Sequence, residues 1–322
     1  MSPDLPPVLK VALDHKAEGL SRNDAAQRSA AISQTYRGGG GSGTIRTETD
    51  ALAYALARMP ATYAAVTASL TAIAEARPAF TPESLLDIGA GPGTATWAAA
   101  EAFTSLRQFT LLDANAALRE LALELTQSSH RLSGIRYEKG DARKLAEEQQ
   151  PADLVIASYV INELGDTERV ALTDVMWSKA RDTLLIVEPG TPAGYARIID
   201  VRTRLIAQGA HVIAPCPHDS ACPLVAPDWC HFSQRLSRSR THKHLKGAEL
   251  PYEDERFSYV VLSRSPLPQR PSRVLAEPQV TKIAVTAKLC TAEGVHIANV
   301  PHRNKESYKQ AKRWRWGDAV PR

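Results

Sequence analysis

The sequence predicts an α/β protein with a mainly parallel central sheet, preceded by helices and followed by a small β segment. Three observations predict this. From residue 84, apolar runs of strand length alternate with helical stretches, which is typical of parallel strands joined by crossover helices. Helical periodicity fills the region before these runs, and short alternating runs follow residue 266. With 322 residues, 43% of them hydrophobic, the chain can bury a substantial core.

The first region, residues 1–80, is predicted to be helical on both sides of a glycine-rich linker at 38–43. Apolar residues recur every three or four positions over about 5–35 and again after residue 47. Thr47 with Asp50 resembles a capping box, and Pro60 is expected to divide the second block into two helices. The glycine run has no following Lys-Ser or Lys-Thr, so a linker is favoured over a phosphate-binding loop.

The second region, residues 81–266, is predicted to hold a seven-stranded sheet. A long polar insertion, 215–250, separates the last two strands, and insertions of this length usually carry function. Residues 267–322 are predicted to form a small β appendage with a basic C-terminal tail. The expected strands are 84–90, 108–114, 134–140, 152–159, 182–189, 211–215 and 257–264.

A glycine loop follows the first of these strands and precedes a helix. Gly89, Gly91 and Gly93 permit a tight turn and close approach of a ligand to the backbone. Asp113 and Asp141 end the next two strands, where a carboxylate reaches ribose hydroxyls or an adenine edge. Because the carboxyl ends of parallel strands share one edge of a sheet, these residues predict a nucleoside-binding crevice.

The stretch "LDIGAGPGT", with the two aspartates and "ASYVINEL", resembles the class I S-adenosylmethionine-dependent methyltransferases. The resemblance implies a Rossmann-like seven-stranded sheet that binds S-adenosylmethionine. The implied cofactor-binding residues are Asp87, Gly89, Gly91, Gly93, Asp113, Asp141 and Ser158.

The sequence identifies no catalytic residue. The fourth strand ends in "SYVINEL" rather than an Asn-Pro-Pro-Tyr motif, and all four cysteines lie beyond residue 215, away from the crevice. Glu163 and Glu188 are candidates for a general base, although a structural role is favoured for both. Whether the chain is an enzyme therefore stays open at this stage.

Cys216, Cys222 and Cys230 crowd into the polar insertion, and Cys290 lies in the appendage. No secretory signal or transit peptide is apparent and no run reaches membrane-spanning length, so we expect the reducing bacterial cytoplasm and no membrane partner. Clustered cysteines in such a compartment favour a metal over a disulfide scaffold. Spacing alone leaves a 4Fe-4S cluster and zinc, through three cysteines with His218 or His231, nearly even. A redox disulfide ranks third and inert buried thiols last.

Charge is divided unevenly along the chain. Residues 1–190 hold 18 Lys and Arg against 24 Asp and Glu, whereas residues 191–322 hold 21 against 11. Positive charge gathers in 234–247 and 302–318, the second of which also holds Tyr308, Trp314 and Trp316. Basic segments with aromatic rings suit a nucleic acid, and RNA is favoured here.

The methyltransferase-like core, the three cysteines in the insertion, the distant fourth cysteine and the ending "ESYKQAKRWRWGD" together resemble a known family. It comprises the methyltransferase-like proteins of the mitochondrial small ribosomal subunit and their bacterial relatives. "LAYALARMPATYAAV" fits the same family, and the resemblance covers the chain from about residue 45.

The resemblance implies a small-subunit assembly role, ribosomal RNA as partner, S-adenosylmethionine in the crevice and a 4Fe-4S cluster on Cys216, Cys222, Cys230 and Cys290. An iron-sulfur, rRNA-binding assembly factor is therefore the leading prediction. One alternative is an active S-adenosylmethionine-dependent rRNA methyltransferase, and another is a zinc-stabilised interaction module.

Overall fold

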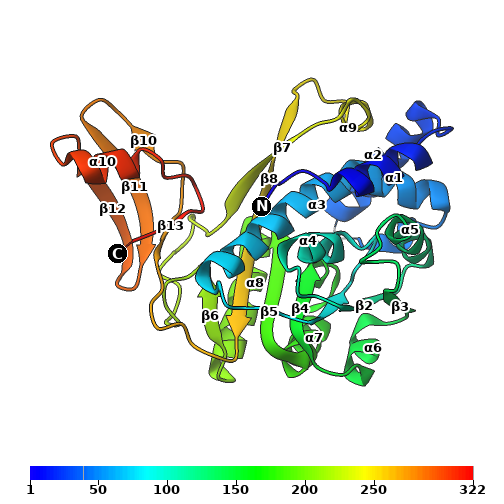
Figure 1. Ribbon diagram of the computed structural model, residues 1–322, viewed down its shortest axis with the longest axis horizontal. Helices are drawn as coiled ribbons and strands as arrows, with labels where there is room; N and C mark the ends of the chain where they lie inside the picture. Colours follow the sequence, from blue (N-terminus) through cyan, green and yellow to red (C-terminus); the bar gives the residue numbers. More distant parts are fainter. Residues whose placement is uncertain (39, 322) are drawn as a thin grey trace.

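An eight-stranded sheet forms the centre of the computed structural model, which describes residues 1–38 and 40–321 (Figure 1). Its strands follow the order β3-β2-β1-β4-β5-β8-β6, with β7 paired to β8. Strands β1 to β5 run parallel, and β8 is antiparallel to β5, β6 and β7. The strands are β1 (Ser84–Ile88), β2 (Gln108–Asp113), β3 (Arg136–Lys139), β4 (Ala152–Ser158), β5 (Ala180–Pro189), β6 (His211–Ala214), β7 (Phe232–Ser237) and β8 (Tyr252–Ser263). This is the class I methyltransferase fold that the sequence predicts, and all seven expected strands are present.

The eighth strand, β7, comes from the insertion and was not predicted. It pairs with the first half of β8, from Phe232 opposite Phe257 to Ser237 opposite Tyr252. Phe232 and Leu236 are buried, while the residues between them are polar or charged. The segment is short and basic, so the alternation of its side chains is a weak signal for a strand. Its backbone finds a partner because β8 is 12 residues long and extends alongside it.

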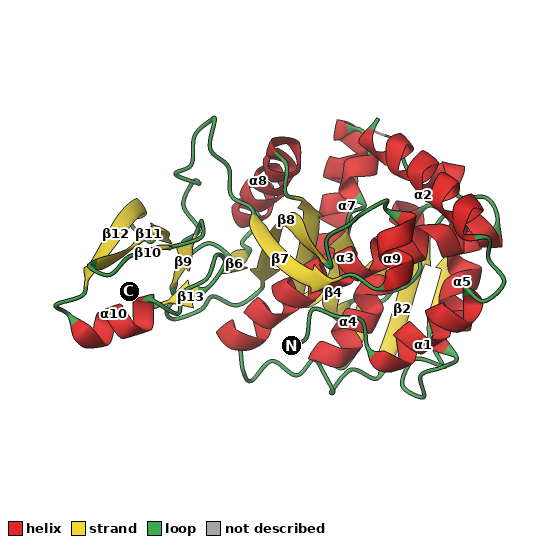
Figure 2. Cartoon of the chain, turned by 90° about the horizontal axis from the view of Figure 1, so that it is seen from above, coloured by secondary structure: helices red, strands yellow, loops and turns green. Residues whose placement is uncertain are grey.

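Helices cover both faces of the sheet, and the alternation of side chains along each strand explains why (Figure 2). In β1, Leu85 packs with the helices of one face and Leu86 with those of the other, because successive residues of a strand point to opposite sides. One face is covered by α3 (Glu48–Ala76), α4 (Thr94–Ala102) and α5 (Ala116–Thr126). The other is covered by α6 (Ala142–Glu148), α7 (Asp166–Lys179) and α8 (Pro192–Ala207).

The N-terminal helices α1 (Pro7–Lys16) and α2 (Arg22–Arg37) pack beside α3, and a single 3-10 turn, η1 (Ser42–Thr44), connects them to it. Thr47 and Asp50 form the expected capping box, with Asp50 N–H donating to the Thr47 hydroxyl at 3.1 Å. The expected break at Pro60 is wrong, because Pro60 lies inside one continuous helix of 29 residues. Its neighbours Met59 and Ala61 are buried, and tertiary packing of this kind overrides the local cost of a proline.

A second, five-stranded sheet stands to one side of the first, beyond β6 (Figure 1). We call residues 272–320 the appendage. Its order is β10-β11-β9-β13, with β12 paired to β11. Its elements are β9 (Ser272–Val274), β10 (Gln279–Val280), β11 (Ala284–Thr291), β12 (Gly294–Pro301), α10 (Lys305–Ala311) and β13 (Ala319–Val320).

Among the residues described, no helix is both long and apolar enough to cross a bilayer.

Candidate cofactor pocket and cysteine centre

A cavity of about 210 Å³ lies where β1, β2 and β4 end. Gly89 and Gly91 adopt φ values of +70° and +53°, which glycine tolerates at little cost. A Cβ atom at Gly89 would collide with the side chain of Val160. Five of the predicted cofactor residues line the cavity: Gly89, Gly91, Asp113, Asp141 and Ser158.

The two aspartates occupy different positions in this cavity. Asp113 accepts the Gly91 N–H at 2.9 Å and the Asn115 N–H at 2.7 Å, so its carboxylate fixes the glycine loop. Burial raises the pKa of Asp113, and these backbone donors oppose the rise. Asp141 caps α6 by accepting the Lys144 N–H at 2.9 Å, and it is exposed. Both carboxylates have remaining lone pairs with which to accept from a ligand.

Asp87 and Gly93, the other two predicted cofactor residues, do not line the cavity. Asp87 is fully buried beneath the loop, where it accepts the N–H of Thr96 at 3.1 Å and its hydroxyl at 2.7 Å. Burial raises the pKa of Asp87 to about 7. Gly93 precedes the first residue of α4 at φ +80°. Their role here is to shape the loop from below.

The N-terminal region supplies one wall of the cavity, which sequence reasoning missed. Ser42, Tyr54, Met59 and Thr62 all line it. Asn115 Nδ2 donates to the carbonyls of Ser42 and Ile45, both at 2.9 Å, and holds η1 over the opening. The segment expected to be a linker at 38–43 is thus partly a wall of the pocket, although Gly39 lies outside the described residues. Only the position of the glycine run upstream of "LAYALARMPATY" hinted at this.

Glu163, a candidate base, also lines the cavity and holds the same segment. Its carboxylate accepts the Ser42 N–H at 3.1 Å. Burial raises the pKa of Glu163 to about 7, the Ser42 N–H opposes this, and the charge of Asp113 adds to it. The other candidate, Glu188, is buried away from the lining and pairs with Arg197 Nε at 2.7 Å. Through these contacts, Glu163 and Glu188 each hold a neighbouring segment in place, which is a structural role.

Cys216, Cys222 and Cys230 lie in the insertion and Cys290 lies on β11, where its Sγ is 3.9 Å from Nε2 of His218 in the insertion. All four are free thiols. Burial raises the pKa of Cys230 well above its usual value, and the negative charges of Cys216, Cys222 and Cys290 add to the rise. Burial also raises the pKa of Cys290 to about 12, again with repulsion from Cys216 and Cys222.

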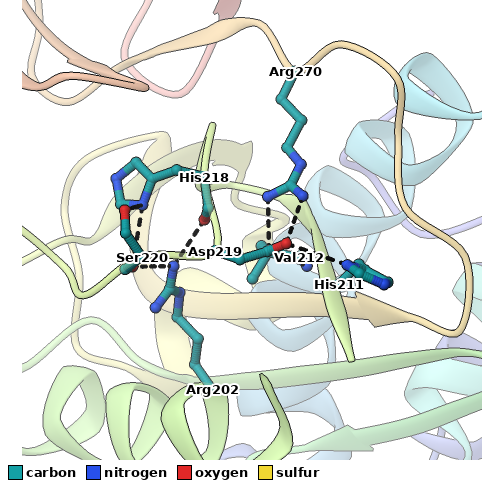
Figure 3. A network of polar contacts seen from close by, with 7 residues as sticks. All are labelled: Arg202, His211, Val212, His218, Asp219, Ser220 and Arg270. Atoms are coloured by element: carbon teal, nitrogen blue, oxygen red, sulfur yellow. Dashed lines mark hydrogen bonds and ion pairs between the residues drawn. The ribbon is translucent and has the colours of Figure 1, made fainter. Parts of the chain in front are cut away.

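The loop between Cys216 and Cys222 is held by a polar network (Figure 3). Arg270 makes two hydrogen bonds of 2.7 Å to the Asp219 carboxylate, which also accepts the Val212 N–H at 2.8 Å. From the opposite side, Arg202 Nη2 donates to the carbonyls of His218 and Ser220, both at 2.8 Å. The loop is therefore fixed both to β6 and to α8.

Two buried arginines lie beside the thiols. Arg202 is 2% exposed and Arg273 is 4% exposed. Arg273 Nε donates to the Pro215 carbonyl at 3.2 Å, and Arg202 Nε is buried with no hydrogen-bond partner among the described residues. Both cations lower the pKa of Cys216 against the larger effect of burial. Buried cations call for a nearby anion, so this environment fits four thiolates in the donor chemistry of an iron-sulfur cluster or zinc.

The histidines considered for zinc differ in position. His218 Nε2 lies 3.9 Å from Cys290 Sγ, whereas His231 stacks on Trp229 with ring centroids 4.8 Å apart. Among residues 1–38 and 40–321, no group of three or more His, Cys, Asp or Glu side chains is arranged around the position of a metal ion. The cysteines and His218 are thus not arranged as a coordination sphere among the described residues.

The two basic segments are not equivalent. In the first, Arg235 pairs with Asp254 at 2.7 Å, and Arg238 and Lys246 both pair with Glu253. Much of its charge is neutralised by the start of β8. The second segment instead exposes its charge just before, on and after α10: Arg303, Lys305, Lys309, Lys312, Arg313 and Arg315.

The aromatic residues of the second segment, which were expected to suit a nucleic acid together with its basic residues, make contacts within the protein. Tyr308 is buried and donates to the Thr281 carbonyl at 2.6 Å. Trp316 Nε1 donates to the His231 carbonyl at 2.9 Å and so ties the appendage to the insertion. Trp314 packs against the small cores of the appendage. Tyr308 and Trp314 thus pack within the appendage, whereas Trp316 packs against the core of the larger sheet.

Comparison with known proteins identifies relatives over most of the chain. Residues 48–321 match the family model described as mitochondrial small ribosomal subunit Rsm22. The human mitochondrial ribosome assembly protein METTL17 is 30% identical over 299 residues, which cover 85% of this chain and 63% of that protein. Rsm22-cox11 tandem protein 2, a mitochondrial protein of Schizosaccharomyces pombe, is 24% identical over 86% of this chain and 44% of its own length.

Solved structures similar to this one include methyltransferases. Magnesium protoporphyrin IX methyltransferase from Synechocystis PCC 6803 superposes with a TM-score of 0.43 at 12% identity, covering 72% of this chain and 94% of that one. An O-methyltransferase family protein from Burkholderia thailandensis gives a TM-score of 0.43 at 14% identity, covering 68% and 60%.

The comparisons correct the expected location. The bacterial cytoplasm was predicted because no leader was apparent at the start of the chain. That prediction is wrong: the family model and the matching curated relatives are all described as mitochondrial. A missing leader signal is a weak guide to location.

Proposed function

We propose that this chain, which belongs to the Rsm22 family of mitochondrial small ribosomal subunit proteins, acts in assembling a mitochondrial small ribosomal subunit. The observation that carries the proposal is the family match over residues 48–321, which includes every candidate ligand of the cofactor pocket and the cysteine centre. The chain spans 63% of the length of its human relative. The proposal therefore concerns the part of the human relative that this chain spans.

Ribosomal RNA is the partner that we propose for the appendage. The basic side chains on and after α10 are exposed, and phosphates attract such a set through counterion release. The first basic segment contributes less, because Asp254 and Glu253 pair with its cations. RNA binding is therefore assigned to the appendage more than to β7 and α9 (Arg240–Leu245).

S-adenosylmethionine is the ligand that we propose for the 210 Å³ cavity. The loop at Gly89 and Gly91 leaves room for a ligand against the backbone. Asp113 and Asp141 lie at the ends of adjacent strands, where carboxylates can accept from ribose and adenine groups. The contacts of Asp87 with Thr96 support the loop from beneath.

For Cys216, Cys222, Cys230 and Cys290 we propose a 4Fe-4S cluster. The support is that three half-buried thiols of the insertion and the buried thiol of Cys290 influence one another's pKa values, and that the cations Arg202 and Arg273 act on the same thiols. When bound, the cluster would supply a covalent crosslink between the insertion and the appendage. Metal binding then contributes to the folding free energy of this region.

Binding of full-length protein, purified without oxygen, to small-subunit rRNA tests the RNA role. We expect affinity to fall steeply as salt rises, with the slope reporting the phosphates contacted. A matched comparison uses Lys309→Gln against Arg235→Gln, since only Lys309 is unpaired by the described residues. Binding no stronger than that of an acidic protein of similar size would contradict the proposal.

Elemental analysis and absorption spectroscopy of the same material test the centre. Iron with inorganic sulfide, lost in Cys222→Ser, is the expected result. Stoichiometric zinc would instead establish the zinc-stabilised module, which the position of His218 beside Cys290 favours as the alternative.

Methyl transfer is the second candidate function, favoured by a further cavity that adjoins the cofactor pocket and shares Tyr54, Thr62 and Tyr159 with it. Transfer of a labelled methyl group from S-adenosylmethionine to immature small-subunit particles, lost in Asp113→Ala, would support it. Absence of transfer to naked RNA, to particles and to proteins would leave assembly without catalysis.

A further inference from the structure

A cavity of about 290 Å³ lies beside the cofactor pocket, between α2, α3 and the segments that follow β4 and β5. Three of its lining residues, Tyr54, Thr62 and Tyr159, also line the cofactor pocket. Its size is near the lower end for small-ligand sites, about 300–1,000 Å³. A ligand of one or two rings suits this volume, and a bound ligand would lie next to the cofactor.

The walls of this cavity are aromatic. Tyr36 and Tyr54 stack with ring centroids 5.8 Å apart and planes inclined by 25°. Burial raises the pKa of both phenols, so their hydroxyl groups stay protonated and uncharged. The rings offer a ligand flat apolar surfaces, which favour a planar ring system.

The charge lining the cavity is already balanced. Arg58 Nη2 lies 3.3 Å from Glu255 Oε1, and the Tyr159 hydroxyl donates to the same oxygen at 2.9 Å. Because its cation has a partner, Arg58 does not favour an anionic ligand such as a free phosphate. An uncharged ligand fits this electrostatic environment.

One polar atom in the lining lacks a partner. Asn162 Oδ1 is buried without a hydrogen bond among the described residues. A buried acceptor left unpaired is unfavourable, so the site selects a ligand that offers an N–H or O–H donor. A purely apolar ligand would leave this atom unsatisfied.

The backbone at the boundary of the two cavities is strained. Tyr159 adopts φ +57°, which is uncommon for a residue with a Cβ atom and costly for an aromatic one. Its N–H donates to the Val187 carbonyl at 2.8 Å, which holds the strained turn. Conformations of this kind cluster at ligand sites because surrounding structure enforces them.

We infer that this cavity binds a nucleobase with an exocyclic amino group, whose ring packs against the tyrosines and whose amino group donates to Asn162. A base in RNA must leave its stack to enter such a site. The inference deepens the proposed function and rests on it where the base is taken to belong to RNA. It requires no methyl transfer.

Cytidine and uridine provide the test, because they differ at the position of the amino group and neither competes as an adenosine for the cofactor pocket. Saturation-transfer NMR on the full-length holoprotein measures the binding of both nucleosides. We expect cytidine to bind roughly tenfold more tightly, the effect of one hydrogen bond to a buried acceptor. Equal binding of the two nucleosides, or binding of neither, would overturn the inference.

Variants separate recognition from folding. Asn162→Leu should abolish the preference for cytidine, whereas Asn162→Asp, which keeps an acceptor oxygen, should retain it. Asn299→Leu, at an exposed position of β12, is the matched control and should bind as the wild type does. A cytidine preference that survives in Asn162→Leu with an unchanged unfolding temperature would refute the assignment.

A labelled five-residue oligocytidine distinguishes the source of the base. Tighter binding than that of cytidine, with a salt dependence, identifies an RNA base, and equal binding identifies a free nucleoside; both support the cavity. Small-subunit rRNA binding is measured in parallel. If the protein prefers cytidine but does not bind small-subunit rRNA, only the proposed function is contradicted. If it binds the rRNA but does not prefer cytidine, only the assignment of the cavity is contradicted.

Discussion

We call residues 1–263, which end with the last strand of the larger sheet, the methyltransferase-like body. The body and the appendage are both built on sheets, but the body buries many more apolar side chains. The body has a large apolar core on each face of its sheet. The main core of the appendage consists of Val274, Ala287, Leu289 and Val320. A small core seldom stabilises a fold without a crosslink or a metal. The appendage is attached to the insertion by hydrogen bonds of Arg273 and Trp316 and, as we propose, by a metal centre at the cysteines.

Removing a thiol should have the largest effect on the stability of the appendage relative to that of the body. In Cys290→Ser, we expect amide hydrogen exchange across residues 272–320 to rise by roughly a hundredfold, because the proposed metal centre would lose its ligand in the appendage. Exchange in β1, β4 and β5 should not change. Thr286→Ser on the same strand is the control, and an equal rise throughout the chain would show that the two regions unfold together.

Core truncations should have effects that stay within their region. Leu185→Ala, at a fully buried position of β5, should lower the free energy of unfolding of the body by about 2–5 kcal/mol through lost burial and a residual cavity. The same truncation at Leu289 should loosen the appendage and leave the denaturant midpoint of the body unchanged. Circular dichroism during urea titration and hydrogen exchange measure the two effects, and a matching loss of body stability in Leu289→Ala would contradict their independence.

These two regions also differ in what the sequence could predict. Seven of the eight strands of the body follow from apolar runs such as "SLLDI" and "DLVIAS", because each of these strands needs only its own side chains to be recognised. β7 was missed because its partner, β8, lies 15 residues further along the chain and determines its pairing. Pro60 was misread because the packing around α3 decides its conformation.

The candidate sites show the same limit. Gly89, Gly91 and Asp113 were predicted to lie at the cavity, and they line it, because a glycine loop after a strand is a local pattern. Ser42 was not predicted, since its place in the wall depends on a contact with Glu163, which lies 121 residues away in the sequence. Paired charges such as Arg235 with Asp254 are likewise invisible to a count of basic residues.

Changes of pH should act on the body through Glu163. Its folded pKa of about 7 lies above its value of about 4.3 in an unfolded chain. Unfolding between these values releases a proton, so the contribution of Glu163 to stability is full below pH 4 and is lost as the pH rises through 7. Glu163→Gln does not titrate, and its stability relative to the wild type should rise by about 1–2 kcal/mol between pH 5 and pH 8, after allowance for partial exposure. Thermal unfolding measures this; Glu148→Gln, at an exposed position, should show no such trend, and a parallel pair of curves for Glu163→Gln would exclude the raised pKa.

The smallest effect is expected where the body carries positive charge that is already paired. Arg235 makes two hydrogen bonds to Asp254, at 2.7 and 2.8 Å, and lies over the ring of Tyr252. Arg235→Gln should therefore change neither the affinity for small-subunit rRNA nor its salt slope beyond a small fraction, and should cost less than about 1 kcal/mol of stability because the pair is exposed. Lys309→Gln, on α10, should instead reduce the magnitude of the slope of log K against log salt by about 1, since one phosphate contact is lost. If both variants reduced the slope equally, the RNA-binding surface would have to extend over β7 and α9. RNA binding would then be shared by the body and the appendage, as the net charge of the two basic segments alone predicted.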